Sequence, residues 1–144
     1  MSDKVLRVLA AIALGFSAYV HLHLASRFGF PGTISGTTVF RIQGVVAAAL
    51  AVALLVSGNK WVWVAAAVVG LASFTAVMLY RYVNVGAIGP LPNMYDSTWE
   101  PSPEKFLSAI AEIAVPILWL VDLGIRQSAI SVVHRRSAAP QPGG

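Results

Sequence analysis

The chain has 144 residues, of which 57% are hydrophobic and 11% charged, and its formal net charge is +4. A soluble chain of this size would lack the interior volume to bury so many apolar side chains, which indicates a single domain embedded in a lipid bilayer. The chain has no cysteine, so disulfides, thiolate metal sites and CxxC redox exchange are excluded. Its Lys and Arg residues lie at the ends of apolar runs and form no basic face, which argues against a nucleic-acid partner.

Four apolar stretches follow one another, each long enough to cross a hydrocarbon core of about 30 Å as a helix. The first covers about 5–24. A cleaved signal peptide is the alternative there, but the stretch is longer than a typical signal sequence core, it contains two histidines, and no A-x-A site follows it. The second and third, about 40–56 and 61–83, are separated by a short polar turn, which predicts an antiparallel hairpin. With the fourth, about 106–123, the predicted fold is an all-α bundle of four transmembrane helices within residues 1–126.

Two longer connections and a tail complete the chain. Residues 26–39 form a connection rich in Gly and Thr. Residues 84–105 form a longer one, whose four prolines preclude a regular helix and whose aromatic side chains predict a packed cap on the membrane surface. The tail, residues 127–144, is expected to be largely disordered.

The distribution of basic residues predicts the orientation of the bundle. The end that carries both termini holds six Lys and Arg residues, whereas the opposite end holds four together with several acidic residues. Because cytoplasmic loops carry the excess of positive charge, we expect both termini in the cytoplasm and the 84–105 loop outside. The expected location is the plasma membrane of a bacterium, as a multi-pass protein.

Several ionisable residues in the apolar stretches fall in the outer half of the bilayer, whereas the inner half has almost nothing comparable except Asp122, which has Arg126 one turn later as a partner. Glu112 lies about 9 Å and His21 about 6 Å inside the boundary, by the helical rise. A charge in hydrocarbon costs at least ~2.5–3.5 kcal/mol, so Glu112 must face the bundle interior and pair, or be protonated. One hypothesis is a ligand-binding polar pocket lined by His21, Arg41, Arg81 and Glu112. The alternative is that Glu112 pairs with an Arg or with Lys105 only to hold the helices in register.

The loop sequence offers a second candidate site. Tyr95, Asp96, Trp99 and Glu100 would present an aromatic and acidic surface to a partner protein. In the alternative interpretation, Tyr95 and Trp99 are anchors at the membrane interface.

Metal binding and catalysis find no support in the pattern. His21 and His23 are two residues apart, so on a helix their side chains point about 200° away from one another and cannot both bind one ion. We therefore expect no metal or haem. The sequence contains no nucleophile elbow, phosphate-binding Gly loop or paired catalytic carboxylates, so no catalytic residue is predicted and an enzyme is not expected.

The segments VLRVLAAIALGFSAYVHLHL and FRIQGVVAAALAVALLV resemble the small bacterial membrane proteins grouped as DoxX-like. They are also similar to uncharacterised actinobacterial membrane proteins in which the first helix ends in H-L-x-L. The resemblance implies a four-helix membrane protein. Some DoxX-like proteins are linked to quinone-dependent sulfur oxidation or act as partners of redox enzymes.

Two functions are compatible with these features. The first is a non-catalytic accessory or interaction subunit, which binds other membrane proteins or further copies of itself through its helix faces and the long loop. The second is a quinone-, lipid- or anion-binding protein, such as a DoxX-like redox partner, that uses the polar pocket in the outer leaflet.

Overall fold

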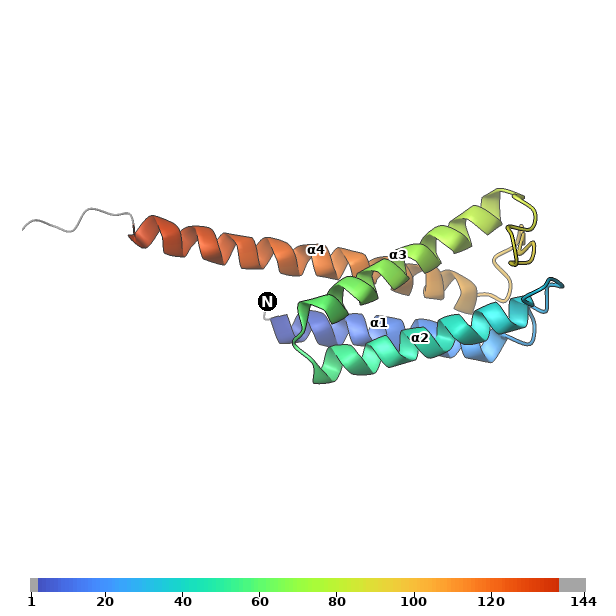
Figure 1. Cartoon of the computed structure of the whole chain (residues 1–144), viewed down its shortest axis with the longest axis horizontal. Helices are drawn as coiled ribbons and strands as arrows, with labels where there is room; N and C mark the ends of the chain where they lie inside the picture. The colour runs from blue at the N-terminus through green and yellow to red at the C-terminus, as the bar shows by residue number, and fades with distance from the viewer. Residues whose placement is uncertain (1–2, 138–144) are drawn as a thin grey trace, which may run out of the picture.

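The computed structural model describes residues 3–137, and this part of the chain is all-helical apart from one isolated β-bridge in a loop (Figure 1). The helices are α1 (Asp3–Leu24), α2 (Gly36–Val56), α3 (Lys60–Tyr82) and α4 (Glu104–Ser137). Each is long and apolar enough to cross a membrane. The prediction of an all-α fold with four such helices is therefore confirmed.

The helices run up and down, so that the start of α1 and the turn between α2 and α3 share one end of the bundle, called the terminal end here (Figure 1). The two longer connections, 25–35 and 83–103, share the opposite end, called the loop end. Helix α1 packs closely against α2 and α4, and α3 packs mainly on α4. The contact between α2 and α3 is looser, and the two helices separate toward the loop end.

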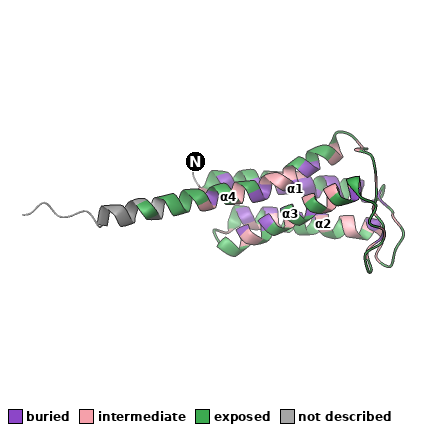
Figure 2. Ribbon diagram, turned by 90° about the horizontal axis from the view of Figure 1, so that it is seen from above, coloured by how far each residue is buried: buried purple, intermediate pink, exposed green. Residues whose placement is uncertain are grey.

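Small residues allow the close helix contacts. A Cβ atom added at Gly44 would lie 2.6 Å from Cγ of Leu22, and one added at Gly70 would lie 2.7 Å from the carbonyl oxygen of Glu112. These glycines let α2 approach α1 and let α3 approach α4, as small residues do between helices in membranes. Buried residues accordingly lie on the faces that the helices turn toward one another, while the outward faces are exposed and largely apolar (Figure 2).

Two helix starts are set by capping side chains. Ser35 Oγ accepts a hydrogen bond from the Thr38 amide at the start of α2, and Asn59 Oδ1 accepts one from the Trp61 amide at the start of α3. Helix α2 therefore begins at Gly36, ahead of the predicted start at about residue 40. Hydropathy marked only the apolar part of this helix, whereas its polar first turn is stabilised by the cap.

The largest correction concerns the C-terminal part of the chain. The sequence predicts a fourth helix that ends at about residue 123 and a largely disordered tail over 127–144, but α4 continues to Ser137. Residues 138–144 lie outside the described part. No proline lies between residues 124 and 137 to end the helix. The polar side chains after residue 123 end the apolar span, but polar residues are compatible with a continuing helix. At 34 residues α4 is about 51 Å long, well beyond a hydrocarbon core of about 30 Å.

Charged side chains connect the helices at the terminal end. Arg126 Nε lies 2.7 Å from Asp122 Oδ2 one turn earlier in α4, and Arg126 Nη2 lies 2.9 Å from Asp3 Oδ1 in α1. Arg7 Nη1 donates to the carbonyl oxygen of Ser57 in the turn after α2, at 2.9 Å. Helices α1, α2 and α4 are thus tied together at this end.

At the loop end the two connections pack on one another. The Ile34 amide donates to the Pro90 carbonyl oxygen at 3.0 Å, and the Asp96 amide donates to the Tyr80 carbonyl oxygen at 3.1 Å. The 84–105 segment therefore folds back over the helix ends, whereas its position on a membrane surface stays a prediction. Beneath this segment, where α2 and α3 separate, lies the cavity described below.

Candidate functional site

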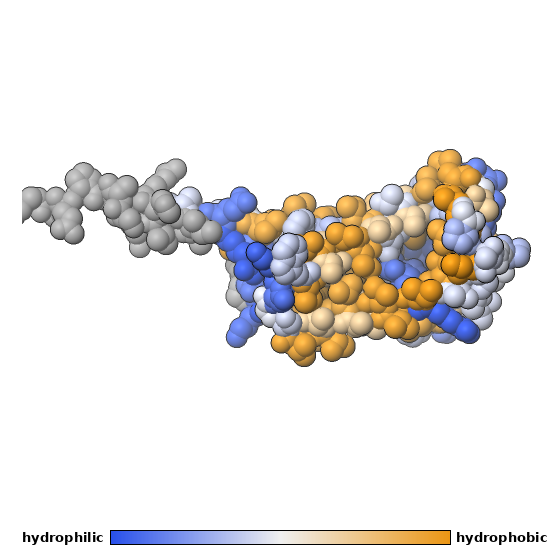
Figure 3. Space-filling model, viewed as in Figure 1, coloured by the Kyte–Doolittle hydropathy of each residue, from blue (hydrophilic) through white to orange (hydrophobic). Residues whose placement is uncertain are grey.

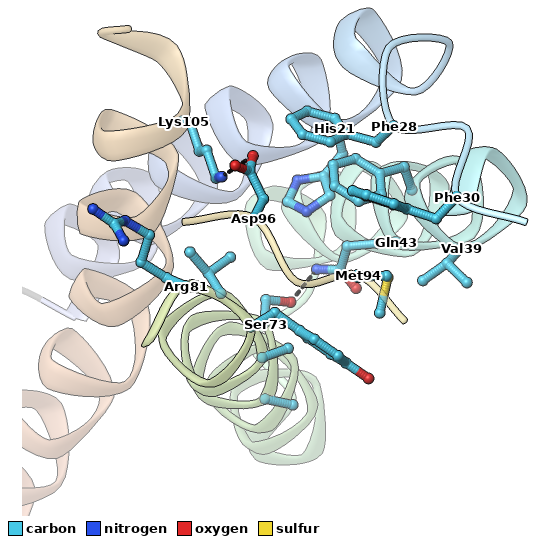
Figure 4. Close-up of a pocket in the computed structure, with 15 residues that line it drawn as sticks. His21, Phe28, Phe30, Val39, Gln43, Ser73, Arg81, Met94, Asp96 and Lys105 are labelled. Atoms are coloured by element: carbon cyan, nitrogen blue, oxygen red, sulfur yellow. Dashed lines mark hydrogen bonds and ion pairs between the residues drawn. The ribbon is translucent and has the colours of Figure 1, made fainter. Parts of the chain in front are cut away.

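A cavity of about 250 Å³ lies between α2 and α3 at the loop end (Figure 4). Helix α1 contributes His21 to it, α2 contributes residues 39, 40 and 43, and α3 contributes residues between 72 and 81. Both loops and the first turn of α4 complete the lining. Every helix of the bundle therefore supplies part of this one site.

Aromatic rings form one wall of the cavity. Phe28 stacks on Phe40 with ring centroids 4.8 Å apart and lies 5.9 Å from Phe30, and the His21 ring lies 5.1 Å from Phe40. The loop can bring Phe28 and Phe30 onto α2 because residue 36 is glycine: a Cβ there would overlap the carbonyl oxygen of Phe28. The Gly36 amide also donates to the Phe30 carbonyl oxygen at 2.9 Å. The wall is thus apolar, flat and held by backbone contacts.

Two polar side chains face one another across the cavity from α2 and α3. Gln43 Nε2 donates a hydrogen bond to Ser73 Oγ (Figure 4). Ser73 is buried and Gln43 half-buried. This hydrogen bond joins α2 and α3 in the region where they otherwise have few contacts.

Behind the cavity, His21 connects to a buried polar cluster between α1 and α4. Its Nδ1 lies 2.9 Å from the carbonyl oxygen of Ser17 and 3.7 Å from Glu112 Oε1. Ser17 Oγ donates to Glu112 Oε1 at 2.9 Å, and Ser108 Oγ lies 3.4 Å from the same oxygen. Glu112 is only 1% exposed. Glu112 therefore lies next to the lining residue His21 but does not line the cavity itself.

This cluster decides between the partners that the sequence allowed for Glu112. The expectation of an Arg or Lys105 as its partner is wrong, because its neighbours are Ser17, His21 and Ser108. Lys105 points instead to Asp96, with Nζ 2.6 Å from Oδ2 (Figure 4). The expectation that Glu112 faces the interior of the bundle is confirmed.

Asp96 is part of the cavity lining and not of an outward-facing loop surface. Partial burial tends to raise the pKa of its carboxyl, but hydrogen bonds from Lys105 and Thr98 outweigh this effect and hold the pKa below its ordinary value. Asp96 and Lys105 thus form an ion pair at neutral pH. Lys105 Nζ also donates to the Thr98 carbonyl oxygen at 2.7 Å, so its hydrogen-bonding capacity is largely used.

The other loop residues of the predicted partner surface divide into two groups. Trp99 packs edge-on against Phe106 with centroids 5.4 Å apart, and the Arg81 guanidinium lies 5.5 Å from its ring. Tyr95 and Glu100 are exposed, and Glu100 Oε2 accepts a hydrogen bond from the Ser102 amide. The four residues therefore do not form one continuous surface.

Of the two arginines predicted in the pocket, the structure brings only Arg81 to it. Arg81 lines the cavity, and its guanidinium lies 5.1 Å from the Tyr82 ring. Within residues 3–137 it forms no ion pair with a carboxylate. Arg41 is exposed and does not line the cavity. The physical reason is helical geometry: Arg41 lies about 200° around α2 from Gln43, which faces the cavity.

Sequence reasoning missed most of the cavity lining, namely its aromatic wall and the Gln43–Ser73 pair. A usable signal was present for the pair, since each is a polar residue inside an apolar helix. No such signal marked Phe28 and Phe30, which lie in a loop. Within the described residues, no group of three or more His, Asp and Glu side chains is placed to hold a metal ion.

No protein-family model, curated protein or solved structure matches the chain. The resemblance to DoxX-like proteins therefore stays a prediction. Function must be argued from the cavity and its surroundings.

Proposed function

We propose that the chain is a multi-pass membrane protein that binds a small lipid-soluble molecule in the cavity between α2 and α3. The observation that carries this proposal is the composition of the cavity, an aromatic wall opposite a few polar side chains. Ligand sites for small molecules have this character. A cavity of about 150 Å³ accepts benzene, so 250 Å³ suits a headgroup of one or two rings.

The route into the cavity supports a ligand that dissolves in the bilayer. Figure 3 shows hydrophilic residues at the bottom of a recess, flanked by hydrophobic surface on α2 and α3. Exposed apolar side chains such as Ile42 and Val68 cover the outward faces of these helices. With lipid around those faces, a ligand would reach the recess sideways from the membrane. A quinone ring or a lipid headgroup has this solubility, and the DoxX-like resemblance points toward quinones.

The polar groups at the cavity give such a ligand its orientation. Gln43 and Ser73 supply an amide and a hydroxyl, and Arg81 supplies a cation without a carboxylate partner in residues 3–137. A carbonyl or hydroxyl oxygen on the ligand would bond to these groups, while its ring packs against Phe28 and Phe40.

We expect Ala76→Trp to remove the bound molecule. Ala76 lines the cavity, and an indole there occupies the space of a ligand ring. The amount of small molecule released from the purified protein by denaturation, measured by mass spectrometry of the extract, should fall at least about tenfold, which corresponds to ~1.4 kcal/mol of binding free energy.

Ala65→Trp is the matched control, because Ala65 lies on the exposed side of the same helix. It should retain the molecule at the wild-type level. Equal retention in the Ala76→Trp protein, or an empty but stable wild-type protein, would overturn the proposal.

One observation favours the accessory-subunit function as a second candidate. Helix α4 projects beyond the other helices at the terminal end, where a partner could pack along it (Figure 1). Native mass spectrometry of the wild-type protein separates the two candidates. A retained small molecule supports the ligand-binding protein, whereas a retained protein subunit without a small molecule supports the accessory subunit.

We further propose that the terminal end faces the cytoplasm, on the basis of its excess of Lys and Arg. Because the chain has no cysteine, single cysteines report the orientation directly. Ser97→Cys lies in the exposed long loop. It should react with a membrane-impermeant maleimide in bacterial cells whose plasma membrane is intact and whose outer layers let the reagent through. Gly58→Cys, in the exposed turn at the terminal end, should react only after lysis. The reverse pattern would show the opposite orientation.

A further inference from the structure

The ring of His21 is held in one orientation by its surroundings. Nδ1 lies 2.9 Å from the carbonyl oxygen of Ser17, and the ring face lies against Phe40 at 5.1 Å. A carbonyl oxygen only accepts hydrogen bonds, so in this contact Nδ1 must carry the hydrogen. A second acceptor, Glu112 Oε1, lies on the same side at 3.7 Å from Nδ1. The tautomer with hydrogen on Nδ1 is therefore the one that fits these neighbours.

This tautomer leaves Nε2 as a hydrogen-bond acceptor. All hydrogen bonds of the ring within residues 3–137 are made by Nδ1, and His21 lines the cavity. Two donors of the cavity are engaged elsewhere: Gln43 donates one of its amide hydrogens to Ser73, and Lys105 donates to Asp96 and to the Thr98 carbonyl oxygen. Nε2 therefore accepts no hydrogen bond within residues 3–137, and a ligand in the cavity can supply the donor.

The charged form of the ring fits the geometry less well. A histidine cation would be expected to hydrogen-bond Glu112, but the distance of 3.7 Å is too long for that, and Glu112 Oε1 instead accepts a hydrogen bond from Ser17 Oγ at 2.9 Å. The cavity also already contains Arg81, a cation without a carboxylate partner in residues 3–137, which would repel a second positive charge; the charge of Lys105 is neutralised by Asp96.

We infer that His21 Nε2 accepts a hydrogen bond from a hydroxyl group on a flat, lipid-soluble ring, and that the cavity therefore selects phenol-like ligands, including the reduced form of a quinone, over ring ethers or ketones of the same size. This inference rests on the proposed function, because it requires a ligand in the cavity. It adds the chemical class of the ligand and the atom that recognises it.

The test compares two probes of nearly equal shape, 2-naphthol and 2-methoxynaphthalene, binding to the full chain in lipid nanodiscs. Both have two rings and an oxygen that can accept a hydrogen bond, but only 2-naphthol can donate one to Nε2. We expect the wild-type protein to bind 2-naphthol at least about fivefold more tightly, the usual contribution of one hydrogen bond. His21→Phe retains a ring against Phe40 and should bind both probes equally. Ala76→Trp should bind neither.

The outcomes separate this inference from the proposed function. Equal affinity of the wild-type protein for the two probes, with both lost in Ala76→Trp, overturns the role of His21 and leaves the cavity as a ligand site. A preference for 2-naphthol that persists in His21→Phe also overturns that role. Binding of neither probe above empty nanodiscs overturns both proposals. Equal affinity of the wild-type protein for the two probes overturns the role of His21 without any variant, so this outcome can be reached even if His21→Phe fails to fold.

Discussion

Replacing Gly70 with valine is expected to destabilise the bundle by about 3 kcal/mol, the upper part of the usual range for overpacking in a well-packed interior. The new Cβ would lie 2.7 Å from the carbonyl oxygen of Glu112, 3.1 Å from Cβ of Val115 and 3.3 Å from Cδ of Pro116. The nearest of these atoms belongs to the backbone of α4 and cannot turn away as a side chain could. Helices α3 and α4 must therefore move apart to accommodate the substitution.

Thermal unfolding of the detergent-solubilised protein, followed by the loss of monodisperse material, measures this effect. Gly15→Val is the control, because nothing lies within 4 Å of a Cβ at position 15. The control should unfold close to the wild-type temperature, since a valine there meets only the surrounding detergent or lipid. Similar unfolding temperatures for Gly70→Val and Gly15→Val would show that α3 does not pack on α4 as described.

Replacing Glu112 with alanine is the second change with a large expected effect, a loss of about 2–4 kcal/mol. The substitution leaves a void at a position that is 1% exposed, and it removes the acceptor of the Ser17 hydroxyl. A buried hydroxyl without a partner is unfavourable because it has given up its bonds to water. The contact between α1 and α4 near His21 should weaken as a result.

Glu112→Gln is the matched comparison for this site. Glutamine has nearly the same volume and keeps an oxygen that accepts from Ser17, so we expect a loss below about 1 kcal/mol in the same unfolding measurement. Glu104→Ala, in the half-buried first turn of the same helix, should also have a small effect. If Gln and Ala at position 112 destabilised the protein equally, the charge of Glu112 and not its hydrogen bond with Ser17 would be the important property.

Together these substitutions separate architecture from ligand binding. Gly70 and Glu112 hold α4 against α3 and α1, whereas Ala76 and His21 line the cavity. If the Ala76→Trp protein loses the ligand but unfolds at the normal temperature, the ligand binds in the cavity. The loss would then not be a consequence of a destabilised bundle.

Several features of the site were predictable from local sequence. His21, Arg81 and Glu112 were expected to face inward, because an ionisable side chain in an apolar span avoids the surrounding hydrocarbon. The structure places His21 and Arg81 on the cavity and Glu112 directly behind it. The same argument failed for Arg41, which lies in the second turn of α2, close enough to the helix start for a long side chain to reach polar surroundings without turning inward.

The number of helices and the approximate positions of their apolar spans follow from the amino-acid sequence, since the length of an apolar run is a local property that can be compared with the thickness of a bilayer. The packing of the helices was needed to show that Ser17 is the partner of Glu112, that Lys105 turns to Asp96, and that two loop phenylalanines form a wall of the cavity. Hydropathy gives the depth of a residue in the membrane but not the rotation of its helix or the identity of the facing helix. Those depend on contacts between segments far apart in the chain, such as the close approach that Gly44 and Gly70 allow.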